Sequence, residues 1–329
     1  EATMKHLKGN LLLFVTSLIW GTAFVAQSAS MKHIGPFTFN FIRCSISILC
    51  ITPVMLMSFK KYKLTNSNAA PSDHTGLYKR ISDRCDNLYD KEKSIKFKHV
   101  IVGIICGTAL FIAMSLQQKG MVYTSVTNAG FITAMYIVMV PILNIIFKRY
   151  PRPITVLCVI AAVFGLYLLT VPENGGFSAV NKGDVYMIIS ALGFSVQIIA
   201  VEHLAKKLDG VTISWVQFIM CALLALPSIF IFNENVNLDS ILAAKVSILY
   251  AGALSGGLAY TLQIVGQKDT EPTIASLIMS LESVFAVIAG IIILHESPTT
   301  RTLLGCAIMF AAIVISQIPS KKKNDKLTV

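Results

Sequence analysis

The chain has few charged residues. Asp, Glu, Lys and Arg make up 14% of its 329 residues, whereas about a quarter of the residues in soluble domains are charged. Hydrophobic residues account for 54%, and the mean hydropathy is +0.68. A soluble domain of this length needs a polar surface, so the composition argues against one and indicates a protein embedded in a lipid bilayer.

Several kinds of functional site are also missing. The seven cysteines are scattered without CxxC spacing, which argues against a zinc site or a disulfide framework. No glycine-rich loop of the Walker type occurs, so ATP would not be hydrolysed by this chain. The apolar segments contain no paired acids and no nucleophile with a neighbouring base. We therefore expect neither an enzyme nor a bound cofactor or metal.

The net charge of +11 reflects the positions of the basic residues in the loops. Of the 28 Lys and Arg residues, 22 lie in the N-terminal segment, the C-terminal tail and every second loop between apolar segments, and five lie in the other loops. Cytoplasmic loops of membrane proteins carry such an excess. The basic balance thus predicts cytoplasmic termini and no nucleic-acid partner.

Ten apolar segments approach the length of about 20 residues that a membrane-spanning helix needs. The first is longer than the apolar core of a signal peptide and is interpreted as a spanning helix. A basic loop, residues 60–98, is expected to be mainly a solvated cytoplasmic linker, with binding to anionic lipid as the alternative. The expected spans are residues 9–29, 36–57, 99–118, 126–147, 154–171, 184–204, 211–232, 246–266, 273–294 and 302–318.

The two halves of the chain resemble each other. "SLQQKGMVYTSVTNAGFI" (115–132) aligns without a gap with "TLQIVGQKDTEPTIASLI" (261–278), and residues 7–21 align more weakly with 181–195. This pattern predicts two repeats of five spans each. An odd number of spans per repeat makes the second repeat insert upside down, as in transporters that bind substrate at the repeat interface.

We place the boundary between the repeats after residue 172, so that residues 1–172 and 173–329 form the two halves. The fold expected from the sequence is therefore an all-α membrane protein with ten transmembrane helices in two inverted five-helix repeats.

Four stretches of the sequence resemble a known family. "SLIWGTAFVAQ" (17–27), "FNFIRCSISI" (39–48), "NAGFITAMYIVMVPIL" (128–143) and "ASLIMSLESVFAVIAGIIILHESPT" (275–299) are similar to EamA-type members of the drug/metabolite transporter superfamily. The resemblance covers nearly the whole chain. It implies a ten-helix fold in the bacterial plasma membrane and movement of small metabolites, often export of amino acids or related compounds.

The sequence departs from the family pattern in span 9. The family motif Leu-Glu-Pro is replaced here by Leu281-Glu282-Ser283. Because proline favours a kink, we expect span 9 to be straighter than in relatives.

Two charged residues lie well inside the expected spans, namely Glu282 and Arg43. Charges at membrane depth are costly and usually face a bundle interior or a wet cavity. Glu282 is a candidate for binding an amine or a coupling proton, and Arg43 for binding a carboxylate or phosphate. The alternative is that they pair with each other or hold helices together.

Polar and aromatic residues in the spans form a second group of candidates. Gln117 and Gln263 occupy the same position in the two repeats, as do Tyr136 and Glu282. Each of these side chains has a structural alternative, because glutamines bond between helices and aromatic rings pack. The candidates for substrate binding are Glu282, Arg43, Tyr136, Gln117, Gln263, Trp20, Asn40 and Gln197, with Gln27, Asn128, Gln217 and Tyr260 as weaker members.

Two further patterns concern packing and the cytoplasmic end of the bundle. The pairs Gly103/Gly107 and Gly252/Gly256 predict close helix contacts. Glu202 and its neighbour His203 end span 6 and are interpreted as interfacial residues.

The sequence favours a monomeric secondary transporter that moves a small polar metabolite through the bilayer, by export, with protons as one source of coupling. An importer or exchanger of an amine, quaternary ammonium or nucleobase-like solute is the first alternative. A lipid-carrier flippase or a channel is the alternative from another functional class.

Overall fold

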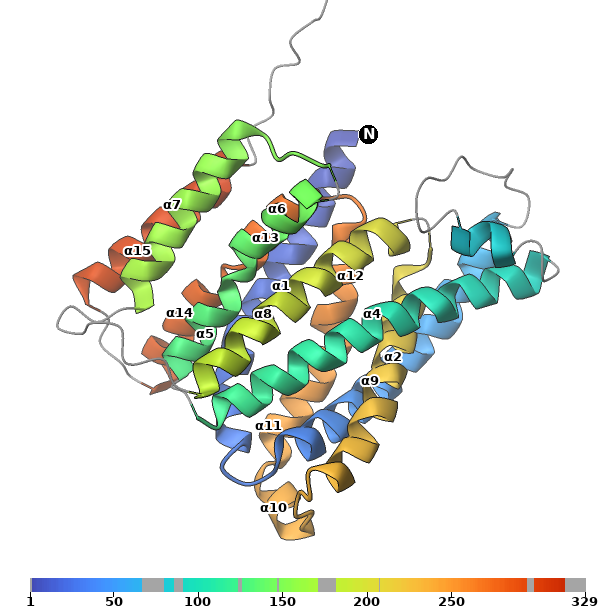
Figure 1. Cartoon of the computed structure of the whole chain (residues 1–329), viewed down its shortest axis with the longest axis horizontal. Helices are drawn as coiled ribbons and strands as arrows, with labels where there is room; N and C mark the ends of the chain where they lie inside the picture. The colour runs from blue at the N-terminus through green and yellow to red at the C-terminus, as the bar shows by residue number, and fades with distance from the viewer. Residues whose placement is uncertain are drawn as a thin grey trace, which may run out of the picture.

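The computed structural model shows a helical bundle (Figure 1). It describes residues 2–66, 80–85, 91–123, 126–146, 148–170, 182–206, 208–294 and 299–316, and this part of the chain contains helices and turns but no strand. The all-α class expected from the sequence is confirmed. In chain order the elements are α1 (Ala2–Ser30), α2 (Pro36–Asn66), α4 (Lys91–Met121), α5 (Val126–Ala134), α6 (Tyr136–Ile146), α7 (Pro153–Thr170), α8 (Lys182–Ala200), η1 (Val201–Ala205), α9 (Gly210–Ile231), α10 (Leu238–Ala243), α11 (Lys245–Leu249), η2 (Tyr250–Tyr260), α12 (Thr261–Gln267), α13 (Pro272–Met279), α14 (Glu282–Leu294) and α15 (Thr300–Ser316).

Within the described residues, eight helical segments are long and apolar enough to cross a membrane. They coincide with eight of the ten expected spans, and the other two expected spans correspond to shorter apolar helices, Pro153–Leu168 and Thr300–Ser316. The chain is therefore a multi-pass membrane protein.

The basic loop is shorter than expected, because helices extend into it from both sides. Helix α2 continues to Asn66, and α4 begins at Lys91. Residues 67–79 and 86–90 of this loop lie outside the described residues, so the structure describes the expected linker only at residues 60–66, 80–85 and 91–98.

Proline marks the start of several helices. Pro36, Pro153 and Pro272 are the first residues of α2, α7 and α13. The first turn of a helix has no use for the N–H group that proline lacks, and the ring presets the helical φ angle. These three positions therefore begin helices without the loss of a hydrogen bond.

The helices are arranged in a repeated pattern of pairs (Figure 1). Helices α7 and α15 pack together at one edge of the bundle, and α2 packs along α9 near the opposite edge. Between these edges, α4 packs on α8, and α1 packs on η2 and α12. In the expected numbering of ten spans, in which span 6 corresponds to span 1, the first two contacts join corresponding spans, 5 with 10 and 2 with 7. The contact of span 3 with span 6 likewise corresponds to that of span 8 with span 1.

Glycine allows two further helix contacts to form, those of α4 with α9 and of η2 with α2. A Cβ atom on Gly107 would lie 2.7 Å from the carbonyl oxygen of Gln217, and one on Gly256 would lie 2.0 Å from Oγ of Ser47. Helix α4 can approach α9, and η2 can approach α2, only because neither glycine has a side chain. The expected role of both glycine pairs in close packing is confirmed.

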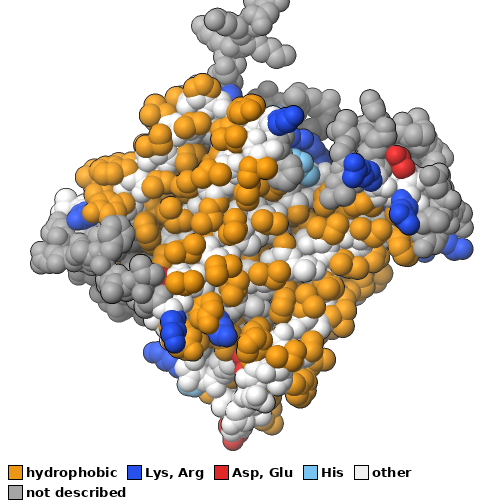
Figure 2. Space-filling view, viewed as in Figure 1, with side chains coloured by type: hydrophobic (Ala, Val, Ile, Leu, Met, Phe, Trp, Pro, Cys, Tyr) orange, Lys and Arg blue, Asp and Glu red, His pale blue; other side chains and the backbone are white. Residues whose placement is uncertain are grey.

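The outer surface is suited to lipid. Many large apolar side chains are exposed on it, among them Leu49, Ile146, Phe230 and Ile292. Figure 2 shows one face on which apolar side chains cover the middle, while Lys and Arg side chains lie toward the ends of the bundle. In water such a surface would be unfavourable, whereas in a bilayer it faces hydrocarbon.

Candidate functional site

Two spans are interrupted near the centre of the bundle. Span 4 is divided into α5 and α6 at Met135, and span 9 into α13 and α14 at Ser280 and Leu281. At both breaks the backbone forms tighter bonds between residues three apart, such as Leu281 N to Ile278 O at 3.1 Å. Span 9 is thus interrupted although it lacks the family's proline, and the expectation that it is straighter than in relatives stays a prediction.

Serine side chains accompany the break in span 9. Oγ of Ser280 donates to the carbonyl oxygen of Leu277 at 2.8 Å, and Oγ of Ser276 donates to that of Thr273 at 2.9 Å. Serine hydroxyls that bond to the preceding turn compete with the backbone and bend helices. At the break in span 9, serine hydroxyls are therefore the side-chain groups that favour a turn.

The two breaks place Tyr136 and Glu282 at equivalent positions. Tyr136 is the first residue of α6, and Glu282 is the first residue of α14. The Tyr136 hydroxyl donates to Oε1 of Glu282 at 3.1 Å, and both side chains are buried. The partial positive charge at the start of α14 further favours a carboxylate there.

Arg43 is the second buried charge. Its side chain is 1% exposed, and Nη1 donates to Oε1 of Gln27 at 3.2 Å, while Nε has no partner. Among the described residues no ion pair joins Arg43 to Glu282, so these charges are not partners of each other. Each has only uncharged side-chain partners, which leaves both charges available to a ligand.

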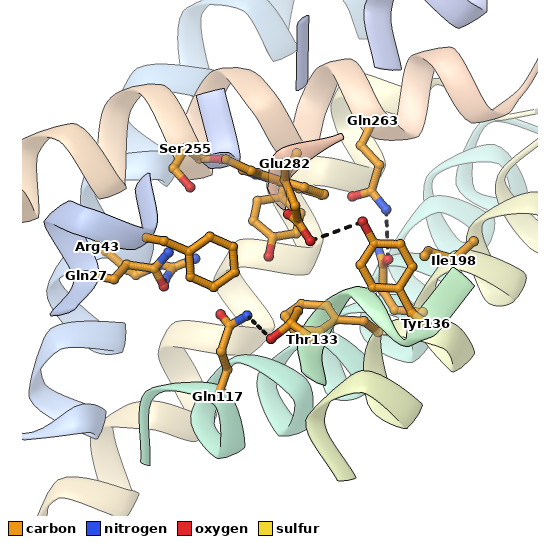
Figure 3. Close-up of a pocket in the computed structure, with 14 residues that line it drawn as sticks. Gln27, Arg43, Gln117, Thr133, Tyr136, Ile198, Ser255, Gln263 and Glu282 are labelled. Carbon is orange, nitrogen blue, oxygen red and sulfur yellow. Dashed lines mark hydrogen bonds between the residues drawn. The ribbon is translucent and has the colours of Figure 1, made fainter. Parts of the chain in front are cut away.

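These residues surround one central cavity (Figure 3). It holds about 440 Å³ of empty space. Arg43 and Gln27 lie on one side of it, Tyr136 and Gln263 lie on the other, and Glu282 points in between. Its lining consists of Trp20, Phe24, Gln27, Arg43, Gln117, Thr133, Tyr136, Phe194, Gln197, Ile198, Ser255, Tyr260, Gln263 and Glu282.

Glutamine side chains form the polar part of the cavity wall. Gln263 Nε2 donates to Oε1 of Gln197 at 3.0 Å, and Gln197 Nε2 donates to Oε1 of Gln217 at 3.1 Å. Across the cavity, Gln117 Nε2 donates to the Thr133 hydroxyl at 3.3 Å. Amides both donate and accept hydrogen bonds, so they can exchange these partners for a polar ligand.

An aromatic surface completes the lining. The Trp20 and Tyr260 ring centroids are 4.6 Å apart, and Nε1 of Trp20 donates to the carbonyl oxygen of Ser255 at 3.4 Å. Ser255 and Tyr260 belong to η2, a π-helix of 11 residues. Extended π-helical geometry is rare and occurs mainly at functional sites.

Seven of the eight residues proposed from the sequence line this cavity. They are Glu282, Arg43, Tyr136, Gln117, Gln263, Trp20 and Gln197. The eighth, Asn40, does not, because its Nδ2 donates to Oγ of Ser115 at 3.4 Å between α2 and α4. Of the weaker candidates, Gln27 and Tyr260 line the cavity, Gln217 bonds to the wall from behind, and the side chain of Asn128 is outside the described residues.

Five lining residues were missed by sequence reasoning, and the repeat carried a signal for three of them. Residues 7–21 align with 181–195, which places Trp20 opposite Phe194 and, continued along the helix, Phe24 opposite Ile198. Both members of each pair line the cavity, as do both members of Gln117/Gln263 and Tyr136/Glu282. The other missed residues are Thr133 and Ser255, whose small hydroxyl side chains carry no such signal.

Comparison with known proteins agrees with this architecture. The model of the EamA-like transporter family matches residues 7–171 and again residues 181–317. A solved crystal structure superposes with a TM-score of 0.69 over 94% of this chain and 96% of its own, at 14% identity, which shows a shared fold.

The similar curated proteins are named as transporters. An uncharacterized transporter from Archaeoglobus fulgidus is 27% identical over 95% of this chain and 86% of its own length. The uncharacterized transporter YoaV from Bacillus subtilis is 20% identical over 94% of this chain and 96% of its own. An S-adenosylmethionine uptake transporter from Rickettsia bellii is 24% identical over 73% of this chain and 80% of its own. The chain thus belongs to the EamA-like transporter family of the drug/metabolite transporter superfamily and is a membrane transporter.

Proposed function

We propose that this protein is a secondary active transporter that carries a small zwitterionic metabolite, an amino acid or a related compound, through the central cavity. One observation carries the proposal. A single cavity holds one buried carboxylate and one buried guanidinium group, and neither is neutralised by the other. Buried charges without an ionic partner are costly and mark substrate or ion pathways.

The opposite charges suit a solute that carries both signs. An ammonium group would bind Glu282 beside the Tyr136 hydroxyl, and a carboxylate would bind Arg43, whose Nε has no protein partner. Glutamine amides and the Trp20 and Tyr260 rings would contact the rest of the solute. Of this empty space, only about 30 Å³ is wide enough for water-sized molecules, so a larger solute requires the cavity walls to move apart.

We propose alternating access between two inverted halves, residues 1–172 and 173–329, each with five spans. The twofold match of the family model, the repeated pattern of helix pairs and the equivalent lining pairs support this arrangement. The excess of Lys and Arg in alternate loops supports a cytoplasmic location for both termini. The cavity lies where the two halves meet, which is where such transporters bind substrate.

The proposed direction is export across a bacterial plasma membrane by a monomer, with protons coupled through Glu282. Import is the second candidate, because the relative from Rickettsia bellii is named as an uptake transporter for S-adenosylmethionine. That compound contains an amino-acid group, which Glu282 and Arg43 could bind in the same way. Both candidates therefore place the zwitterionic group at the same two residues.

Ligand-dependent thermal stability of the purified protein tests the site. The panel contains amino acids, polyamines, quaternary amines, nucleobases and organic anions. We expect an amino-acid ligand to raise the melting temperature of the wild type, and both Glu282→Gln and Arg43→Gln to lose this effect. Asn40→Ala is the matched control, because Asn40 is buried but outside the cavity. Ligand stabilisation that survives in both cavity variants would refute the site.

Flux through liposomes tests the transport class. We expect saturable uptake that a solute on the opposite side accelerates, and we expect Glu282→Gln, which lacks the partner of the ammonium group, to lose both exchange and proton-driven accumulation. Unsaturable flux would indicate a channel, and exchange of lipid-linked head groups alone would indicate a flippase. Proton-driven accumulation that persists in Glu282→Gln would overturn the coupling role.

A further inference from the structure

A second cavity lies at the end of the bundle that carries the basic loops. It holds about 900 Å³ of empty space, including its opening to solvent. Charged side chains of both signs line it, among them Arg149, Glu202, Lys206, Lys268, Asp269 and Glu271. We call it the vestibule. It is separate from the central cavity, because the two share no lining residue.

The same segments that line the central cavity continue into the vestibule. Tyr136 lines the cavity and Asn144 lines the vestibule, both on α6 and about 12 Å apart along the helix. Gln197 on α8 is followed by Glu202 on η1, and Gln263 on α12 is followed by Lys268. The vestibule therefore lies at the end of the bundle to which the helices of the central cavity lead.

The vestibule contains a buried carboxylate, that of Glu202. The Glu202 side chain is 6% exposed, and its Oε1 accepts from Nη1 of Arg149 at 2.7 Å, although the Arg149 side chain is 54% exposed. Glu202 lies at the end of the bundle, where an interfacial residue is expected, and its side chain within the π-helical turn η1 is buried. The ion pair joins the chain segment between α6 and α7 to the end of α8.

The second oxygen of Glu202 is only partly satisfied. Nδ1 of His203 lies 2.7 Å from Oε2 of Glu202 and 2.9 Å from the carbonyl oxygen of Ile199. A single ring nitrogen carries a single hydrogen, so one of these two acceptors is without it at any moment. A carboxylate oxygen that lacks a full donor is a strong acceptor for a cation with N–H groups.

Asn144 provides an independent acceptor. Its side chain is 3% exposed and lines the vestibule, and its Oδ1 has no hydrogen-bond partner. A buried carbonyl oxygen without a partner costs about 1–3 kcal/mol, so such groups are rarely left unpaired. A ligand with several N–H donors could satisfy Asn144 and Glu202 together.

The nearby lysines do not take this place. The Lys268 ammonium group donates to the carbonyl oxygen of Leu208, and burial lowers the pKa of Lys268 below its usual value. Lys206 is exposed at the rim. Among the described cationic side chains that line the vestibule, Arg149 is thus the one that contacts Glu202, through its exposed guanidinium group.

We propose that Glu202 and Asn144 form an entry site for an organic cation with N–H donors, a primary ammonium or guanidinium group, and that Arg149 occupies this site when no ligand is bound. An incoming cation displaces Arg149 and breaks the link that holds the two chain segments together. That the vestibule is the cytoplasmic mouth of the transport path rests on the proposed function, whereas cation binding itself does not.

Chemical replacement of Arg149 tests the site. Methylguanidinium binding to the full-length protein in detergent is measured by calorimetry for wild type, Arg149→Ala and Arg149→Ala/Glu202→Gln. We expect Arg149→Ala to bind the probe at least about tenfold more tightly than wild type, because the internal competitor is gone. The double variant should lose binding. Tetramethylammonium, which has the same charge but no N–H group, should bind far more weakly than methylguanidinium.

Two further variants keep the outcome decisive. Asn144→Leu in the otherwise native chain should weaken binding of the probe, which tests the site even if removal of Arg149 unfolds the protein. Asn40→Ala, which lies outside both cavities, should leave binding unchanged. Binding that survives in the double variant and disappears when Glu282→Gln is added would locate the probe in the central cavity and overturn the proposal, so failure of the central cavity and failure of the vestibule are distinguishable. Equal affinities in wild type, Arg149→Ala and the double variant, or equal binding of the two probes, would overturn the proposal.

Discussion

Replacement of Gly256 by alanine would test how the two halves are held together. A Cβ atom on Gly256 would lie 2.0 Å from Oγ of Ser47 and 3.3 Å from its Cβ. The hydroxyl cannot simply turn away without loss, because it donates to the carbonyl oxygens of Arg43 and Gly252, both at 2.8 Å. The substitution therefore forces η2 and α2 apart next to the Arg43 side of the cavity.

The expected cost follows from this geometry. Overpacking of a buried contact by one methyl group costs about 1–3 kcal/mol of unfolding free energy. Ser47→Ala alone removes hydrogen bonds that contribute about 0.5–1.5 kcal/mol each. In the double variant Gly256→Ala/Ser47→Ala the closest contact is gone, and the remaining contacts, 3.1 Å to the carbonyl oxygen of Ala251 and 3.3 Å to Cβ of Ser47, require only small shifts. The double variant should thus be clearly more stable than the sum of the two single effects predicts.

Reversible unfolding in mixed micelles, followed by far-UV circular dichroism, measures all four proteins of this cycle. Gly130→Ala is the matched control, since no atom lies within 4 Å of the position of its Cβ atom. It should unfold like the wild type. Single effects that add within about 0.5 kcal/mol would show that the two positions are independent and would refute the packing argument.

Three further predictions concern individual hydrogen bonds. Tyr136→Phe removes the donor at 3.1 Å from Glu282 and should destabilise the fold by about 1–3 kcal/mol in the same unfolding assay, while Tyr123→Phe, at an exposed side chain away from the cavity, should not. Gln263→Leu removes the donor to Gln197 and should reduce ligand-induced thermal stabilisation without loss of fold; full stabilisation would show that these amides do not contact ligand. Glu234→Ala removes bonds to the amides of Phe37 and Thr38 and should cost about 0.5–2 kcal/mol. In Glu234→Ala, the hydrogen exchange rate of the backbone amides at the start of α2 should rise. In the control Asp239→Ala, which changes an exposed side chain, this rate should stay unchanged.

The sequence was a good guide to the cavity where a chemical argument applied to a single residue. A charge in an apolar segment is expensive, so Glu282 and Arg43 were identifiable without knowledge of the packing. The internal alignment added Gln117, Gln263 and Tyr136, which line the same cavity. Asn40 was chosen for polarity alone, and its partner Ser115 lies 75 positions away in the chain, where the sequence offers no sign of contact.

Backbone irregularities were beyond the reach of the sequence. The break at Ser280 and Leu281 was not expected, because proline was absent and serine is compatible with an unbroken helix. The burial of Glu202, which lies in the π-helical turn η1, was not expected from the sequence either. Such turns depend on which neighbouring groups satisfy the backbone, and those neighbours come from distant parts of the chain.

The sequence by itself determined that this is a helical membrane protein of the EamA-like transporter family, because apolar length, loop charge and local motifs are properties of single segments. It also determined which charges lie at membrane depth. The tertiary structure alone decided that Glu282 bonds to Tyr136 and Arg43 bonds to Gln27, and that the two charges do not form a pair. The reason is physical: a span of apolar helix is stable in lipid on its own, whereas the partner of a buried polar group is chosen only when the helices pack.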